Sequence, residues 1–403
     1  MKSLRAMFMR GGTSKALMVL KTDLPSDQKK WDQIFLSLMG SPDSYGRQLN
    51  GMGGGVSSLS KIAVIGKSHL EGVDLDYTFV QVGIEKPVVD YKGNCGNISS
   101  AVAPFAVESQ LLELTDGDHE ISIYNTNTQK IIKAKLNILN GKPNYNGKLS
   151  ISGVNGAGAD IELSFISPAG ASTGSLYPCG EMSLKFTNED FKESSRVLGC
   201  PSEQTQRLKQ RFLQKGFIDI NILDVANACF FIKAQDLDLA AIELPDILNQ
   251  DKDLLKFIDI VRAWISVKMG VAKTLKEAQD IATIPYGVIY SEDIKESLTT
   301  DGELISGQDC EIVCRAIAGK KIHQALPLTV SLCVATFKVL KKILCENKNS
   351  NLSHVKIGTP AGVIEIGVEI DLNLIKIDPL KAIQRGVFLR TARLLMKGDV
   401  YYL

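Results

Sequence analysis

A single cysteine between two small, amide-rich triplets points most directly to chemistry in this sequence. Cys95 lies in the segment 93–97 (GNCGN), where a predicted strand at 77–82 gives way to a small, apolar helix pattern at 101–107. A thiol at the start of a helix faces unpaired backbone N–H groups and the positive end of the helix dipole, and both stabilise a thiolate or a bound carboxylate. The competing interpretation is a buried structural cysteine beside a glycine turn, since free cysteine is among the most buried residue types. The flanking Asn and Gly residues favour chemistry.

A lysine at the start of an apolar strand is the second candidate. Lys61 follows a loop rich in glycine and serine and immediately precedes the segment 62–65 (IAVI). Partial burial at such a position lowers the pKa of the amine, so that neutral Lys61 can act as a general base near neutral pH. The alternative is an ordinary solvated lysine at the end of a strand.

Three loops combine glycine with small polar residues: 9–15 (MRGGTSK), 51–61 (GMGGGVSSLSK) and the loop around Cys95. Glycine lets backbone N–H groups approach a ligand closely, and Ser and Thr add further donors. None of the loops has the Gly-x4-Gly-Lys-Ser/Thr pattern of a phosphate-binding loop, and the second runs into a strand rather than a helix. The loops therefore suit carboxylates, with Arg10 as a fork-shaped partner.

The overall composition is that of an ordinary globular protein. A chain of 403 residues, 44% hydrophobic and 23% charged, predicts two domains. The formal net charge of +1 argues against a broad nucleic-acid surface. The first residues lack the continuous apolar segment of a signal peptide, and no apolar run is long enough to span a bilayer. We therefore expect a cytoplasmic protein without nucleic-acid or membrane partners.

The cysteines and histidines show no spacing typical of metal ligands. There is no Cys-x2-Cys pair among the eight cysteines, and only four histidines occur. Cys310 and Cys314 are spaced to share one face of a helix, and we expect two thiols in a helical core there. No metal site is expected.

The two halves of the chain repeat one order of elements. In the first half a pair of strands at 7–24 is followed by an apolar helix and a hairpin pattern at 119–138. In the second half a strand pair recurs at 218–237, and an apolar helix again precedes a hairpin pattern at 355–370. Each half is therefore predicted to wrap strands around one central apolar helix.

Taken together, these segments resemble the PrpF-type branch of the diaminopimelate-epimerase-like superfamily. That branch includes 2-methylaconitate cis–trans isomerases, methylitaconate Δ-isomerases and 4-oxalomesaconate tautomerases. The shared motifs keep the family order over nearly the whole chain: 9–15 (MRGGTSK), 58–61 (SLSK), 93–99 (GNCGNIS), 125–128 (NTNT), 224–227 (DVAN), 358–363 (GTPAGV) and 390–393 (RTAR). The sequence departs from the usual family pattern at Leu59, Ala228 and Thr359. The helix start at 326–329 (LPLT) is also more apolar than the family pattern, which leaves the identity of the substrate open.

The resemblance implies an α+β chain with the diaminopimelate-epimerase-like fold: two similar domains, each a β-roll around a central α-helix, an active site in the cleft between them, and no cofactor. We expect the first domain at 1–180, the second at 181–383, and a C-terminal strand near 384–403 that returns to the first domain. The catalytic lysine and cysteine of the family correspond to Lys61 and Cys95. Its substrate-binding positions correspond to Arg10, Gly12, Thr13, Ser14, Gly54, Ser60, Asn94, Gly96 and Asn97 in the first domain and to Asn227, His323 and Thr329 in the second.

The expected function is isomerisation of a small unsaturated di- or tricarboxylate by proton transfer. The first expectation for the substrate is 2-methylaconitate, with methylitaconate and oxalomesaconate as alternatives. Lys61 would remove a proton next to a conjugated carboxylate, and helix N–H groups with Arg10 would stabilise the resulting dienolate. Addition of the Cys95 thiolate to the alkene is a second route to rotation about the bond, and the sequence leaves both routes open.

Two rival functions follow from the same residues. One is a non-catalytic protein that binds polycarboxylates. The other is an amino-acid epimerase, which needs one thiol on each central helix, whereas Cys333 lies more than a turn into the second helix. Apart from the small-molecule substrate, the one partner considered is a second copy of the chain, because monomer and homodimer both fit the sequence.

Overall fold

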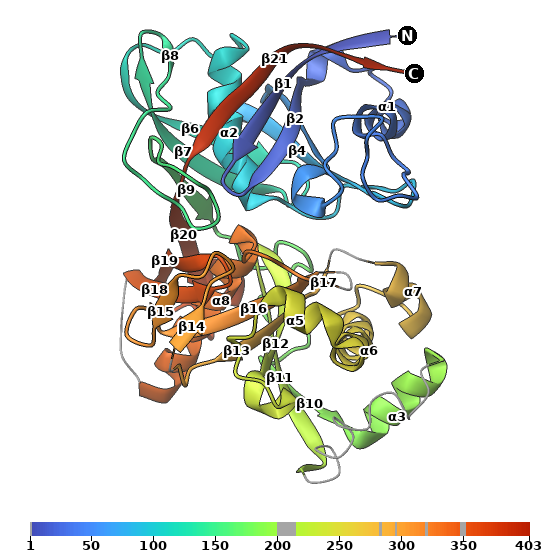
Figure 1. The fold of residues 1–403 in the computed structure, drawn as a ribbon. Helices are drawn as coiled ribbons and strands as arrows, with labels where there is room; N and C mark the ends of the chain where they lie inside the picture. Colours follow the sequence, from blue (N-terminus) through green and yellow to red (C-terminus); the bar gives the residue numbers. More distant parts are fainter. Residues whose placement is uncertain (1, 200–214, 282–283, 295, 319–320, 347–351) are drawn as a thin grey trace. The chain divides into compact units, whose positions relative to one another are not determined.

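The chain divides by its internal packing into two units. The computed structural model describes residues 2–199, 215–281, 284–294, 296–318, 321–346 and 352–403. The first unit comprises Met1–Ile166 and Val387–Leu403, and the second comprises Ser167–Gly386. Strand β20 (Ile383–Arg390) carries the chain from the second unit back into the first (Figure 1).

The boundary falls at Ser167 rather than after residue 180, where the sequence places it. Hydrogen bonds hold the intervening segment on the second unit: the Gly170 N–H donates to the Asp224 carbonyl at 2.8 Å, and Ala169 forms a β-bridge with Val225. The Asp224 carboxylate accepts from the Ser172 N–H at 2.8 Å. These pairings are not visible in the composition of the glycine-rich stretch.

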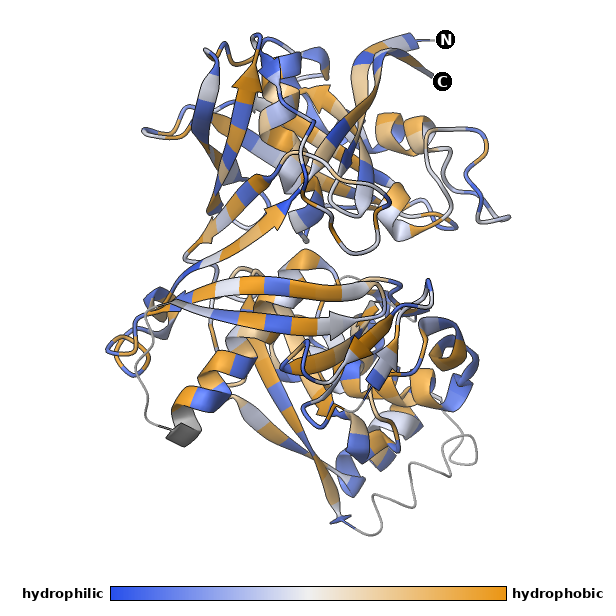
Figure 2. Ribbon diagram, turned by 60° about the vertical axis from the view of Figure 1, so that its left-hand side comes forward, coloured by the Kyte–Doolittle hydropathy of each residue, from blue (hydrophilic) through white to orange (hydrophobic). Residues whose placement is uncertain are grey.

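The described part of the first unit consists mainly of strands and two α-helices. They are β1 (Lys2–Gly11), β2 (Ser14–Leu20), α1 (Trp31–Met39), β3 (Lys61–Lys67), β4 (Leu75–Val82), β5 (Val89–Asp90), α2 (Gly96–Glu108), β6 (Gly117–Asn125), β7 (Lys130–Leu139), β8 (Lys142–Pro143), β9 (Ile161–Ile166) and β21 (Ala392–Tyr402). Hydrophobic and hydrophilic residues alternate along many of these strands, as Figure 2 shows, because successive side chains point to opposite faces of a sheet.

Helix α2 is the centre of the first unit. It packs against β1, β2, β3, β7, β8, β9 and β21. Its residues from Gly96 to Val107 are all buried, since they are small or apolar enough to fit inside a curved sheet. Trp31 and Phe35 of α1 pack with Val64 and Val80 in a separate apolar cluster of the same unit. The expected β-roll around a small apolar helix is therefore present in this unit.

The second unit contains more helices. Its elements are β10 (Ser183–Thr187), α3 (Asn188–Val197), β11 (Phe217–Val225), β12 (Asn227–Lys233), α5 (Pro245–Gln250), α6 (Lys252–Lys268), α7 (Leu275–Asp280), β13 (Tyr286–Ser291), β14 (Glu296–Leu298), β15 (Leu304–Ser306), β16 (Ile312–Ala318), β17 (Lys321–Ile322), α8 (Leu328–Glu346), β18 (Leu352–Thr359), β19 (Gly362–Ile370) and α9 (Pro379–Ala382). Helix α8 packs against β11, β12, β18 and β19 and corresponds to α2.

The strand pairings repeat between the units. In the first, β2 and β3 run parallel, β3 and β4 antiparallel, β4 and β6 parallel, and β6 and β7 antiparallel. In the second, the same four relations join β12 with β13, β13 with β16, β16 with β18, and β18 with β19. In both units the central helix lies between the third and the fourth of these strands in the sequence: α2 between β4 and β6, and α8 between β16 and β18. The predicted duplication therefore extends to the direction of each strand pair.

One local prediction is wrong. Cys314 lies in strand β16 and Cys310 in the turn before it, not on a helix. Two cysteines four residues apart fit one face of a helix. The β-branched residues between them, Ile312 and Val313, favour a strand instead, and both faces of this strand are buried. Of the eight cysteines, Cys200 and the side chain of Cys345 lie outside the described residues. Among the described residues, no helix has the length and hydropathy that a membrane span requires.

Candidate active site

Lys61 begins strand β3, and its amine is almost fully buried. Only 8% of the Lys61 surface is exposed to solvent, and Nζ lies 4.9 Å from the centre of the Phe79 ring. Burial lowers the pKa of the Lys61 amine below its usual range, while the charge of Cys95 acts in the opposite direction. The amine and the thiol are therefore close enough for the charge of one to affect the ionisation of the other.

Gln81 holds the Lys61 amine, and sequence analysis missed it. Lys61 Nζ donates a hydrogen bond to Gln81 Oε1 at 2.6 Å. The amide nitrogen of Gln81 donates to the carbonyls of Ser57 and Ser60, at 3.1 and 2.9 Å, and this fixes the oxygen toward the lysine. Gln81 faces Lys61 across the antiparallel pair β3–β4, a relation that the register alone supplies. Strand β4 also contains Asp76 and Thr78, so the polarity of Gln81 alone did not single it out.

Cys95 is the residue before α2 and is partly exposed. As the N-cap residue, Cys95 makes no side-chain hydrogen bond to the first turn of this helix. The Cys95 Sγ lies 3.8 Å from Ser14 Oγ, so the loop between β1 and β2 meets the helix start at the thiol. Gly96 and Asn94 are buried, and Asn94 Oδ1 accepts from Asn125 Nδ2 at 3.3 Å. The predicted thiol position at a helix N-terminus is therefore present, with a hydroxyl beside it.

The loop after β1 is joined to the first turn of α2. Asn97 Nδ2 donates to Thr13 Oγ1 at 3.1 Å. Arg10 is half-buried, and its Nη1 donates to the carbonyls of Gly12 and Thr391 at 2.9 and 3.0 Å. Burial lowers the pKa of Arg10, and the nearby positive charge of Arg393 lowers it further. The structure thus brings together the predicted residues Arg10, Gly12, Thr13, Ser14, Asn94, Cys95, Gly96 and Asn97.

Replacement of Gly12 by alanine is expected to lower the free energy of unfolding by about 1–3 kcal/mol. Gly12 has a φ of +51°, and a β carbon there would overlap the Asn97 side chain. Urea denaturation measures the change. The matched control is Gly93→Ala, because a β carbon at Gly93 would meet nothing within 4 Å. Equal stability of the two variants would contradict this account of the loop.

Two other predicted positions, the buried Ser60 and the exposed Gly54, lie in the loop that leads into Lys61. Ser60 is fully buried, and its hydroxyl donates to the Val82 carbonyl at 2.9 Å and accepts from Gln48 Nε2 at 2.7 Å. A β carbon on Gly54 would come within 2.7 Å of the Leu59 side chain. These contacts fix the loop that leads into Lys61, so the geometry gives Ser60 and Gly54 a positioning role.

Of the three predicted residues of the second unit, Asn227 and Thr329 are in contact. Asn227 and Thr329 are both buried, and Asn227 Nδ2 donates to Thr329 Oγ1 at 2.7 Å. The His323 ring lies 6.3 Å from the ring of Tyr286, centre to centre. Asn227 follows Ala226, whose φ of +60° makes the sharp turn between β11 and β12.

The repeated topology shows what the second unit lacks. Tyr286, the first residue of β13, occupies the place that Lys61 has at the start of β3, and Pro327 precedes α8 as Cys95 precedes α2. Cys333 is fully buried, and its thiol lies 3.6 Å from the Leu223 carbonyl. The positions in the second unit that correspond to Lys61 and Cys95 therefore carry neither an amine nor a thiol.

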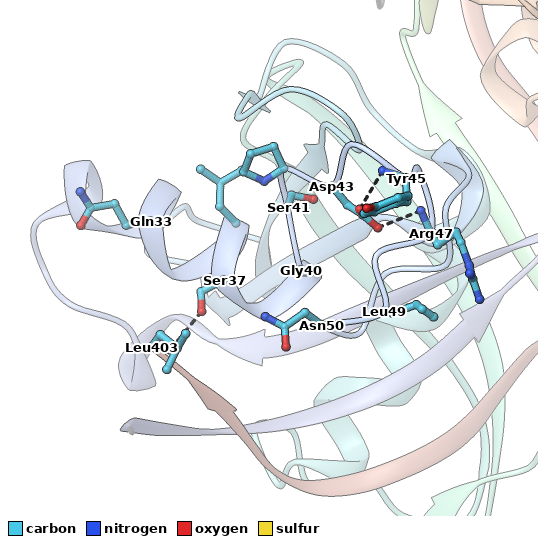
Figure 3. Close-up of a pocket in the computed structure, with 12 residues that line it drawn as sticks. Gln33, Ser37, Gly40, Ser41, Asp43, Tyr45, Arg47, Leu49, Asn50 and Leu403 are labelled. Atoms are coloured by element: carbon cyan, nitrogen blue, oxygen red, sulfur yellow. Dashed lines mark hydrogen bonds between the residues drawn. The ribbon is translucent and has the colours of Figure 1, made fainter.

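A separate cavity of about 720 Å³ lies beside α1. Figure 3 shows its lining, which includes Ser37, Arg47, Leu49 and the C-terminal Leu403. Asp43 shapes the loop by accepting from the N–H groups of Tyr45 and Arg47. Neither Lys61 nor Cys95 lines this cavity. Among the described residues, no group of three or more His, Cys, Asp or Glu side chains is arranged to hold a metal ion.

The arrangement in the first unit suits proton transfer next to a carboxylate. A buried amine of lowered pKa supplies a base, a partly exposed thiol supplies a second ionisable group, and the uncapped start of α2 supplies N–H donors for developing negative charge.

Comparison with known proteins gives a consistent result over the full length. A family model described as PrpF protein matches residues 1–201 and 190–403. The 3-methylitaconate isomerase of Eubacterium barkeri is 34% identical over 98% of this chain and 95% of its own length. The 2-methyl-aconitate isomerase of Cupriavidus necator is 28% identical over 98% of this chain and 96% of its own.

Solved structures agree on the fold. A crystal structure of methylitaconate-delta-isomerase has a TM-score of 0.75 and 32% identity, covering 100% of this chain and 96% of that one. A hydroxyproline epimerase from Agrobacterium vitis has a TM-score of 0.53 at 10% identity, covering 99% of this chain and 92% of that one, which is a likeness of fold alone. The predicted epimerase-like fold class is confirmed.

Proposed function

The chain belongs to the PrpF family and is an isomerase, and we propose that it isomerises a small unsaturated di- or tricarboxylate by moving a proton through Lys61. The observation that carries the proposal is the buried Lys61 amine, with its lowered pKa, beside a partly exposed thiol in the same unit. The two relatives named above act on 3-methylitaconate and 2-methyl-aconitate, which share a carbon–carbon double bond conjugated to a carboxylate.

The proposed reaction starts with neutral Lys61. Its amine takes a proton from the carbon next to the conjugated system, and the electrons spread into the carboxylate as a dienolate. N–H groups at the start of α2 and the Arg10 guanidinium stabilise that charge. Protonation from Lys61 or Cys95, at the same or the other end of the allylic system, gives the geometric isomer or the shifted alkene. No cofactor takes part in this proposal.

We propose 2-methylaconitate as the substrate. The second candidate is methylitaconate. The 28% identity to the 2-methyl-aconitate isomerase supports the first candidate, and the 34% identity to the 3-methylitaconate isomerase supports the second. The two acids differ in the reaction they would undergo. Isomerisation of 2-methylaconitate exchanges the cis and trans arrangements at the double bond, whereas isomerisation of methylitaconate moves the double bond itself. The proton abstraction by Lys61 is common to both.

The proposal is tested by incubating the purified protein with 2-methylaconitate, methylitaconate and oxalomesaconate in turn and following each by ¹H NMR. Turnover of at least one acid is expected, at a rate that depends on protein concentration. Calorimetry on the same acids is the companion measurement. Tight binding of all three without turnover would replace the proposal with the non-catalytic binding function. Turnover of a D- or L-amino acid instead would indicate an epimerase.

A further inference from the structure

The first unit contains a buried arginine, Arg390, that has no acidic partner among the described residues. Arg390, at the end of β20, keeps only 7% of its exposed surface. Its Nε donates to Asn97 Oδ1 at 3.2 Å and its Nη1 to the Leu389 carbonyl at 2.7 Å. Its guanidinium carbon lies 5.8 Å from the centre of the Phe388 ring. All of these partners are neutral, and no partner of Nη2 is found among the described residues.

Two other arginines are buried among the described residues, and each has an acceptor for every guanidinium nitrogen. Arg262 is ion-paired with Asp259 at 2.7 Å and also donates to two carbonyls. In Arg315, Nε, Nη1 and Nη2 all have acceptors within the protein. A buried guanidinium without a counter-charge is costly, because hydrogen bonds to neutral acceptors replace its lost hydration only in part. Desolvation accordingly lowers the pKa of Arg390 to about 10.

The position of Arg390 suggests what its missing partner is. Through Asn97 the guanidinium is tied to the first turn of α2, to which the N-cap residue Cys95 makes no side-chain hydrogen bond. Asn97 also donates to Thr13, which links the guanidinium to the loop after β1. In that loop, the Gly12 N–H donates to the carbonyl of Thr391, the residue after Arg390, at 3.0 Å. Arg10 Nη1 donates to the same Thr391 carbonyl, at 3.0 Å. Positive charge and N–H donors converge there, and the described residues contribute no carboxylate.

We infer that Arg390, with the first turn of α2 and Thr13, forms a subsite for one carboxylate of a di- or tricarboxylate ligand. This inference rests on the proposed function, because it assigns a holding group to that same class of substrate. Arg390 binds a carboxylate that takes no part in the proton transfer, while Lys61 and Cys95 act on the double bond. The planar fork of arginine suits a two-point contact with a carboxylate, which an ammonium does not reproduce.

Binding of tricarballylate, a saturated tricarboxylate that cannot isomerise, tests the subsite. Calorimetry is expected to show dissociation constants about 10–100-fold higher in Arg390→Gln than in the wild type, with a smaller increase in Arg390→Lys. The matched control is Arg385→Gln on the same strand, because Arg385 is already ion-paired with Glu369 at 2.6 Å. The control is expected to bind as the wild type does.

Thermal unfolding separates a ligand site from a structural one. Without ligand, Arg390→Gln is expected to unfold at the same temperature as the wild type or higher, because an unpaired buried charge is removed. The stabilisation by tricarballylate is expected to be lost. A variant that unfolds earlier without ligand but binds tricarballylate like the wild type would overturn the subsite. If Arg390→Gln does not fold, an Arg390→Lys variant with unchanged affinity would overturn it equally.

The two proposals fail in different ways. A wild-type protein that isomerises an unsaturated acid, together with Arg390 variants of unchanged affinity, contradicts the subsite alone. A wild-type protein that neither binds tricarballylate nor turns over any of the three acids contradicts the proposed function, and the subsite with it.

Discussion

Replacement of Lys61 by methionine is expected to lower kcat for isomerisation by about 10²–10⁴, the usual contribution of a positioned acid–base group. Methionine keeps the length of the side chain and fits against Phe79, but it cannot accept a proton. The fold should survive, because the change removes an amine that is costly to bury at 8% exposure. Steady-state kinetics measure the effect, and thermal unfolding checks that the variant is folded.

Cys95→Ser is the companion variant and separates the two chemical routes. If proton abstraction by Lys61 starts the reaction, serine at position 95 still allows slow turnover, because Lys61 can return the proton itself. A variant pair in which Cys95→Ser is inactive while Lys61→Met keeps near wild-type turnover would instead favour addition of the thiolate to the alkene.

Gln81→Glu is expected to move the acidic limb of the pH profile of kcat/KM to higher pH, by about one pH unit or more. A carboxylate 2.6 Å from the ammonium stabilises the charged form of Lys61 and so raises its pKa. Since only neutral Lys61 is a base, activity rises with pH through that pKa. At a pH below the limb, kcat/KM therefore falls about tenfold for every pH unit by which the limb moves.

Gln81→Leu is the control for this displacement of the limb, since it removes the acceptor without adding charge. It should lower kcat by loosening the amine, yet it should not move the acidic limb to higher pH. Identical pH profiles for the wild type and Gln81→Glu would show that Lys61 does not set this limb.

The architecture was largely predictable from the sequence because it depends on local patterns. The apolar run that becomes α2 is bounded by glycine and asparagine, and the alternation in β6 and β7 reads directly as a hairpin. The boundary at Ser167 depends on hydrogen bonds to Asp224, more than 50 positions away in the chain. Cys310 and Cys314 show the limit of spacing arguments, since a strand buried on both faces carries no helical period.

The candidate site was predictable in its reactive groups but not in the groups that support them. Lys61 and Cys95 stand out by type and position, whereas the role of Gln81 depends on the register between β3 and β4. Arg390 lies in a motif that the sequence makes visible, but its burial and its bond to Asn97 arise from the return of the chain to the first unit. Ser60, expected to bind substrate, is fully buried, and its hydroxyl is hydrogen-bonded to Gln48 and to the Val82 carbonyl. These partners come from other loops and strands, so the sequence does not show them.

The most direct test of proton transfer by Lys61 is the deuterium content of substrate and product after partial reaction in D2O. The account predicts deuterium at the allylic carbons of the product and in recovered substrate with the wild type, and none with Lys61→Met. Complete isomerisation by the wild type without any deuterium, under conditions where the Lys61 amine exchanges freely with solvent, would contradict it.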